Sequence, residues 1–277
     1  MEIHAEVAAG ASIADDSPTS PFRRVVQARL RVGFVFARDR VDRASLAHSL
    51  ERTLGRSVGL MRYASYADLA EAVTNAFVDL AWLPPAVYVR VRSTTGVRAV
   101  AVLERGGGRG YCCAILGRNG AFESHDEIVG ARAAWVDPWS AAGYLVPRGM
   151  LAARGIDLAR AFTAERFCGS YDSAVDQLTV RVADIAGAFC TVDDAGKILE
   201  RGWSSAAPVR VLAISAPIPS DLLCTTAAIS DDDALELEAA LTGNGGWSIA
   251  SAVGGSALSA PEPSAYDRFA HIVARTA

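Results

Sequence analysis

The sequence lacks an excess of positive charge. Its 277 residues include 27 Lys and Arg against 31 Asp and Glu, which gives a formal net charge of −4 at pH 7 and a pI near 5.6. A protein that binds nucleic acid needs a basic face to meet the phosphates, and this composition supplies none. We therefore expect no nucleic-acid partner.

Long hydrophobic runs are also missing, although 51% of the residues are hydrophobic. No stretch approaches the roughly 18 apolar residues of a membrane-spanning helix, so we expect no membrane span. The stretch 1–27 is acidic where a signal peptide would have a basic start and a continuous apolar core. From the sequence as given we expect a cytoplasmic protein with a flexible extension over 1–27. A removed leader would instead place it in the periplasm or another extracytoplasmic compartment.

The spacings of a metal or disulfide site are absent as well. The five cysteines form no CxxC pair and no even disulfide framework, and each lies in or beside an apolar strand-like run. The four histidines lie outside the segments that carry the candidate site described below. We expect no metal, no other cofactor and no Ser-His-Asp triad. The residues concerned are Cys112, Cys113, Cys168, Cys190, Cys224, His4, His48, His125 and His271.

What the chain does contain is a regular alternation of strand and helix patterns. Apolar residues alternate from Leu30 to Phe34 as in a strand, and leucines then recur at helical spacing up to Gly55. Similar patterns continue to about residue 242 and predict an α/β fold with mostly parallel sheets covered by helices. No internal repeat is evident. Beyond Gly243 the chain is rich in Gly, Ser, Ala and Pro, so we expect a partly ordered tail with a short helix at 266–275.

A tight turn after the strand-like stretch 131–136 is predicted to open a helix at Ser140. The first-turn N–H groups of Ala141, Ala142 and Gly143 would have no acceptor within that helix, and the helix dipole adds partial positive charge there. Such a helix start favours an anion. A simple capping role for Ser140 explains the same residues.

Several segments share their order and spacing with one known family, although no single motif is decisive. They are Ala64–Leu69, Val78–Trp82, Gly110–Tyr111, Asp137–Pro147, Phe167–Asp172, Val182–Asp184 and Ser215–Asp221. With these segments the chain resembles, from about residue 30 to 242, the phosphonate- and phosphite-binding proteins of bacterial ABC importers.

The resemblance implies the type 2 periplasmic-binding-protein fold, an α/β fold with two lobes and a ligand cleft between them. A hinge of two strands would join the lobes. On this basis lobe 1 is expected to comprise residues 28–108 and 214–277, and lobe 2 residues 109–213. The extension over 1–27 would precede both lobes.

The resemblance also implies a pocket. Asp221 matches the carboxylate that faces the ligand's amine in aminophosphonate-binding relatives. The residues expected to bind the ligand are Tyr66, Tyr111, Trp139, Ser140, Ala141, Ala142, Gly143, Tyr171 and Asp221.

The chain departs from the family pattern at three of these positions. Ala141 and Ala142 lack the hydroxyls of the family's helix start, and Tyr171 stands where phosphonate binders have a histidine. Each lost donor to a charged group would cost on the order of 1.5–3 kcal/mol. We therefore expect weak phosphonate binding and a less demanding anion, such as a carboxylate.

The resulting functional prediction is a protein that binds a small anionic molecule, with or without an amino group, and that has an ABC permease as partner if it is exported. The alternative is a cytoplasmic lyase or biosynthetic enzyme on the same scaffold. In that case Tyr171 or Asp221 would transfer protons, or Cys113 would act as nucleophile. A sensor domain for another protein is a third alternative.

Overall fold

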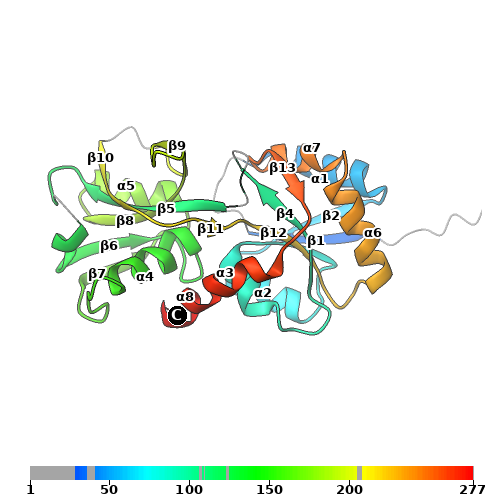
Figure 1. Ribbon diagram of the computed structural model, residues 1–277, viewed down its shortest axis with the longest axis horizontal. Helices are drawn as coiled ribbons and strands as arrows, with labels where there is room; N and C mark the ends of the chain where they lie inside the picture. The colour runs from blue at the N-terminus through cyan, green and yellow to red at the C-terminus, as the bar shows by residue number, and fades with distance from the viewer. Residues whose placement is uncertain are drawn as a thin grey trace, which may run out of the picture.

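The computed structural model describes residues 29–35, 41–105, 108, 110–122, 125–204 and 208–276. These residues form two lobes that lie side by side, each built on its own sheet (Figure 1). The predicted extension over 1–27 lies outside the described residues. The alternation of strands and helices agrees with the predicted α/β class.

Lobe 1 is built on a mixed sheet with the strand order β13-β4-β12-β3-β1-β2. Strand β1 is parallel to β2 and β3, whereas β12 is antiparallel to β3 and β4. Helices α1, α6 and α7 share one core cluster with this sheet, and α2 and α3 share a second. The bounds are β1 (Leu30–Phe34), α1 (Arg43–Leu54), β2 (Val58–Arg62), α2 (Tyr66–Thr74), β3 (Leu80–Leu83), α3 (Pro85–Val91), β4 (Arg98–Glu104), β12 (Leu222–Thr225), α6 (Asp231–Thr242), α7 (Gly246–Ala252) and β13 (Ala257–Ser259).

Lobe 2 has a sheet with the strand order β10-β5-β8-β6-β7, to which β9 and β11 add at β8 and β5. Strand β6 lies between β7 and β8 and is parallel to both. The bounds are β5 (Gly110–Arg118), the 3-10 turn η1 (His125–Ile128), β6 (Ala131–Trp135), the π-helical turn η2 (Ala141–Leu145), α4 (Val146–Ala152), β7 (Phe162–Phe167), α5 (Tyr171–Thr179), β8 (Ile185–Val192), β9 (Ile198–Arg201), β10 (Val209–Ile214) and β11 (Ile218–Pro219).

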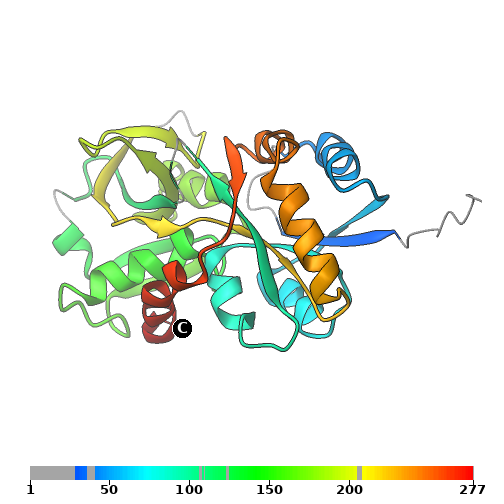
Figure 2. The same cartoon turned by 45° about the vertical axis from the view of Figure 1, so that its right-hand side comes forward.

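The chain passes from lobe 1 to lobe 2 after β4 and returns through β11 to β12. The two crossings touch, because the backbone N–H of Leu103 donates to the carbonyl of Asp221 at 2.9 Å. After β13 the chain forms the turn η3 (Pro263–Tyr266) and the helix α8 (Asp267–Thr276). Figure 2 shows α8 in red at the junction of the lobes, where it contacts α3 and α4. Helix α8 lies within the range 214–277 that was predicted to belong to lobe 1, but it packs against both lobes.

The stretch beyond Gly243, expected from sequence to be a partly ordered tail, contains packed structure. Ile249 of α7 and Leu258 of β13 are buried in the core of lobe 1, and Phe269 of α8 is buried in the core of lobe 2. The small residues in this stretch allow close packing. Helix α7 has only seven residues, and a hydrophobic pattern that short is too weak to predict a helix from sequence.

The two lobes repeat one supersecondary unit, although no internal repeat was expected from the sequence. The arrangement of β1, β2, α2 and β3 recurs as β6, β7, α5 and β8. In lobe 1, Asp79 accepts hydrogen bonds from the backbone N, Nε and Nη2 of Arg31 at 2.7, 3.1 and 2.7 Å. In lobe 2, Asp184 accepts the same three from Arg132 at 3.0, 2.9 and 2.9 Å.

The repeat extends to the connection after the helix. Ala76 follows α2 and Arg181 follows α5, and both have left-handed backbone conformations, with φ of 53° and 58°. They are the only such residues other than glycine in the described part of the chain. The helices α2 and α5 therefore begin at equivalent points of the two lobes.

Gly187 on β8 sets how closely η2 packs on the sheet of lobe 2. A Cβ there would lie 2.8 Å from Cγ of Pro147 and 3.0 Å from the carbonyl oxygen of Ala142. We expect Gly187→Ala to lower the free energy of unfolding by about 1–3 kcal/mol through overpacking, as measured by urea denaturation. Gly59→Ala is the control, because its Cβ would meet only the flexible Arg29 side chain. Equal stability of the two variants would contradict this packing role.

Candidate ligand-binding site

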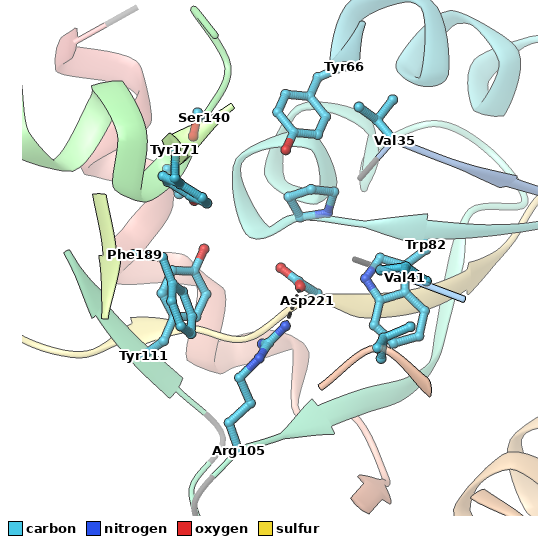
Figure 3. Close-up of a pocket in the computed structure, with 13 residues that line it drawn as sticks. Val35, Val41, Tyr66, Trp82, Arg105, Tyr111, Ser140, Tyr171, Phe189 and Asp221 are labelled. Carbon is cyan, nitrogen blue, oxygen red and sulfur yellow. Dashed lines mark hydrogen bonds and ion pairs between the residues drawn. The ribbon is translucent and has the colours of Figure 1, made fainter. Parts of the chain in front are cut away.

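One pocket among the described residues takes its walls from both lobes (Figure 3). Its polar side chains come from two helix starts, from a turn before a third helix and from the two crossings. Its apolar side chains come mainly from the ends of strands. The lining residues are Val35, Val41, Tyr66, Trp82, Pro84, Arg105, Tyr111, Ser140, Ala141, Tyr171, Phe189, Asp221 and Val253.

Tyr66 and Tyr171 occupy equivalent positions in the repeated unit. Each is the first residue of its helix, directly after a serine cap. The caps are equivalent too, because Ser65 Oγ accepts from the third residue of α2 and Ser170 Oγ from the third residue of α5, both at 3.1 Å. The repeat therefore brings two tyrosines and two positive helix ends to the same pocket, one from each lobe.

The third helix start belongs to η2. The hydroxyl oxygen of Ser140 accepts from the N–H of Gly143 at 3.1 Å, which leaves the hydroxyl hydrogen of Ser140 to donate. The first-turn N–H groups of Ala141 and Ala142 have no acceptor within the helix. Ser140 and Ala141 line the pocket, so this start presents donors to a bound anion.

Helix α1 begins at the pocket as well, after the lining residue Val41, but its start is already occupied by a carboxylate. Asp42 accepts from the N–H groups of Ala44 and Ser45 at 3.0 and 3.3 Å, and from the Ser45 hydroxyl at 2.6 Å. These hydrogen bonds, with that of the Ser45 side chain the strongest, lower the pKa of Asp42 below its ordinary value. A bound anion therefore has three available helix starts rather than four.

Two of the tyrosines are held as neutral donors. Burial raises the pKa of Tyr66 and of Tyr111 well above the ordinary value, and the negative charge of Asp221 adds to the effect in both. Figure 3 shows their hydroxyls pointing toward the middle of the pocket. Both phenols keep their protons at neutral pH and can donate to an oxyanion.

The two crossings contribute an ion pair. Nη2 of Arg105 lies 3.0 Å from Oδ2 of Asp221, and their side chains are only 9% and 18% exposed. Burial disfavours the charged guanidinium, but the attraction and hydrogen bond of Asp221 outweigh burial and raise the pKa of Arg105. The guanidinium therefore stays charged, although it is largely shielded from water.

The arrangement contains no evident metal ligands. In the part of the chain that the structure describes, no three His, Cys, Asp or Glu side chains come together as a metal would require. None of the helices described there has the length and apolar character to cross a bilayer.

Comparison with known proteins identifies the family to which the chain belongs. A family model described as the ABC-transporter phosphonate periplasmic substrate-binding protein matches residues 39–266. The chain belongs to this family. A curated relative, the "Phosphate-import protein PhnD" of Mycolicibacterium smegmatis, is 27% identical over 162 residues, which are 54% of this chain. The match spans 50% of that relative's length.

Solved structures share the fold of this family member. PhnD1 from Prochlorococcus marinus in complex with methylphosphonate has a TM-score of 0.71 and 14% identity, covering 89% of this chain and 97% of the other. A binding-protein component of an ABC phosphonate transporter from Pseudomonas aeruginosa has a TM-score of 0.70 and 16% identity, covering 89% and 87%. These likenesses confirm the predicted two-lobed periplasmic-binding-protein fold.

Six of the residues carried over from the family lie in the pocket lining: Tyr66, Tyr111, Ser140, Ala141, Tyr171 and Asp221. Three others do not. Ala142 is fully buried in the core of lobe 2, and the N–H of Gly143 is used by the Ser140 cap. Trp139 instead stacks beneath Arg90, whose guanidinium carbon lies 4.5 Å from the ring centre.

Cys113, the predicted nucleophile of the enzyme alternative, also lies outside the lining. It is fully buried, and its Sγ is 3.6 Å from Sδ of Met150. Burial raises the pKa of its thiol, which keeps it protonated and poorly nucleophilic.

Arg105, Phe189 and Trp82 line the pocket, although they were not among the residues expected to bind the ligand. Arg105 directly precedes a glycine run that has the composition of a connector. A basic residue at a crossing was the one available signal. Its partner Asp221 is 116 residues away, so local pattern does not reveal the pair.

Removal of Asp221 would leave a buried guanidinium without its counterion. We expect Asp221→Ala to lower the free energy of unfolding by about 3–5 kcal/mol. Asp233→Ala is the matched control, since Asp233 pairs with Arg56 at 2.9 Å but is 40% exposed, and it should cost about 0–1 kcal/mol. Both values come from urea denaturation at neutral pH. A cost for Asp221→Ala no larger than that of the control would show that the pair is not structurally important.

Proposed function

We propose that this protein binds a small oxyanion in the pocket between its lobes and presents it to an ABC permease. The observation that carries the proposal is the convergence of three helix starts on one pocket, those of α2, η2 and α5. Their donors are Tyr66, Ser140 and Tyr171, with Tyr111 from β5 beside them. Family membership supports the same function.

The expected ligand is a phosphate, phosphonate or small carboxylate. The printed descriptions of the relatives name phosphate and methylphosphonate. Helix N-termini and neutral hydroxyls stabilise any of these anions. The absence of a hydroxyl at Ala141, which lines the pocket, still predicts that simple phosphonates bind less tightly here than in a site with a full hydroxyl set.

The residues that line the pocket come from both predicted lobes, 28–108 with 214–277 and 109–213. We propose that the lobes close over the anion and that the crossings at Arg105 and Asp221 act as the hinge. The pairing of α8 with α3 and α4 would then resist or guide the closure.

An ABC permease is the partner that the family implies, and such proteins are described as periplasmic. We propose that the protein works on the outer side of the cytoplasmic membrane. The expectation of a cytoplasmic location stays a prediction, which fractionation of the native host would test.

Nothing in the site favours the enzyme alternative. Cys113 is not among the lining residues and its side chain is fully buried, and Asp221 is held by Arg105. Tyr171, the third predicted catalytic residue, does line the pocket at the start of α5, where a neutral hydroxyl serves as a hydrogen-bond donor. Burial and neighbouring negative charge raise the pKa of Tyr66 and Tyr111, which disfavours both as bases.

The tyrosines at the two helix starts provide a direct test. Tyr66→Phe and Tyr171→Phe should each weaken the binding of phosphate, phosphite or methylphosphonate by about 0.5–3 kcal/mol, the range for one hydrogen bond to a charged oxygen. Tyr144→Phe is the control, because Tyr144 packs edge-on against Trp135 outside the pocket lining. Isothermal titration measures all three. An equal loss for the control would contradict a specific role of the pocket hydroxyls.

A negative charge at the η2 start should compete with the ligand. We expect Ala141→Asp to reduce the affinity for each of these anions below detection, because its carboxylate would occupy the donors of the helix start. Ala67→Asp introduces the same charge in the first turn of α2 but at an exposed residue outside the lining. It should bind almost as wild type does. Retained binding by Ala141→Asp would remove η2 from the site.

A further inference from the structure

Asp221, the acidic residue of the pocket lining, is already paired with a cation of the protein itself, Arg105. Asp221 lies on the returning crossing and Arg105 on the outgoing one, and Figure 3 shows the guanidinium directed at the carboxylate. Their Nη2 to Oδ2 distance is 3.0 Å. Glu200 also raises the pKa of Arg105, but less than Asp221 does.

Most donors of Arg105 are unused. Its Nε and Nη1 are buried and have no hydrogen-bond partner in the described part of the chain. The guanidinium carbon lies 5.8 Å from the ring centre of Tyr111 and 5.4 Å from that of Phe189. Such rings stabilise the positive charge, but they do not replace an acceptor oxygen. Buried donors without acceptors are rare and unfavourable in native proteins, so these donors point to an acceptor from outside the chain.

A free carboxylate beside an anion site would favour a ligand that carries an amino group as well as its anionic group. Here the guanidinium occupies a position beside Asp221 where an ammonium group would otherwise bind. An ammonium brought to the same place would be repelled by Arg105. A carboxylate or other acidic group would instead be attracted and would meet the unused N–H donors.

We propose that Arg105 determines the specificity of the pocket, so that it selects a small oxyanion with a second acidic group and rejects one with an amino group. This inference rests on the proposed function, because it assigns the second end of a ligand whose first anionic group lies at the helix starts. Asp221 is then a positioning residue that holds the guanidinium in place.

Three phosphonates built on the same two-carbon chain test the inference on the wild-type protein. Ethylphosphonate has an apolar end, aminoethylphosphonate a positive end and phosphonopropionate a negative end. Propionate, β-alanine and succinate form the matching series for a carboxylate head group. By isothermal titration we expect the member with two acidic groups to bind about tenfold or more tightly than the amino member, the ratio expected for one hydrogen-bonded charge.

The variant Arg105→Gln should reverse this order. It frees Asp221 for an ammonium group, so the amino member should gain affinity while the member with two acidic groups loses about tenfold or more. The member with an apolar end should change least. Arg56→Gln is the matched control, because Arg56 also pairs with an aspartate, at 2.9 Å, but lies outside the pocket lining. Thermal melting of each variant establishes that it is folded, and the wild-type comparison needs no variant.

The outcomes separate this inference from the proposed function. If the simple oxyanions bind but the amino member binds the wild type more tightly than the member with two acidic groups, the second oxygen of Asp221 accepts the amine and the specificity role of Arg105 is wrong. An equal loss of all three members in Arg105→Gln would likewise overturn it. If neither these ligands nor phosphate or phosphite binds the wild type, the proposed function fails and the inference fails with it.

Discussion

The guanidinium of Arg105 is buried beside the carboxylate of Asp221 where the two crossings meet, so this contact links the two segments that join the lobes. The pair lies at the pocket, so it has a structural and a binding consequence at once. Two charges taken out of water are stable only while each has its partner. The crossings are therefore linked by the same groups that line the pocket, and a change in one charge affects both the crossings and the pocket.

A repeated β-α-β unit explains why the remaining donors converge. In each lobe an aspartate accepts hydrogen bonds from an arginine on the middle strand of the unit, which is β1 or β6. A serine then caps the helix that begins with a tyrosine. Two lobes that face one another thus supply Tyr66 and Tyr171 from equivalent positions. The repeat is broken at the other helix start, where Asp42 caps α1 but Ser140 caps η2. The Asp42 carboxylate occupies the start of α1, whereas the start of η2 is capped by a neutral hydroxyl and can accommodate an anion.

The parts of this arrangement that local chemistry decides could be predicted from the sequence. The strand and helix patterns, the Ser140 cap and the tyrosines at the helix starts depend on residues a few positions apart, and they agree with the structure. Arg105 could not be predicted, because its role comes from a partner 116 residues away. The π-helical turn was equally hidden, and it explains why Ala142 faces the core rather than the pocket. The repeated unit could not be predicted from the sequence, because its two copies share a three-dimensional arrangement but few identical residues.

The charge of the whole protein has little part in how it would hold an anion. The formal net charge is −4, and Asp42, Asp137 and Asp221 all lie at or near the pocket. Long-range attraction would therefore not bring an anion to the pocket, since the net charge is negative. Binding must come from short, oriented donors: phenol and serine hydroxyls, first-turn N–H groups and the guanidinium. Because these donors act at contact distance and away from water, dissolved salt screens them weakly. Selectivity then depends on which donors remain unpaired, and in this pocket the ion pair at the crossings decides that for the second end of the ligand.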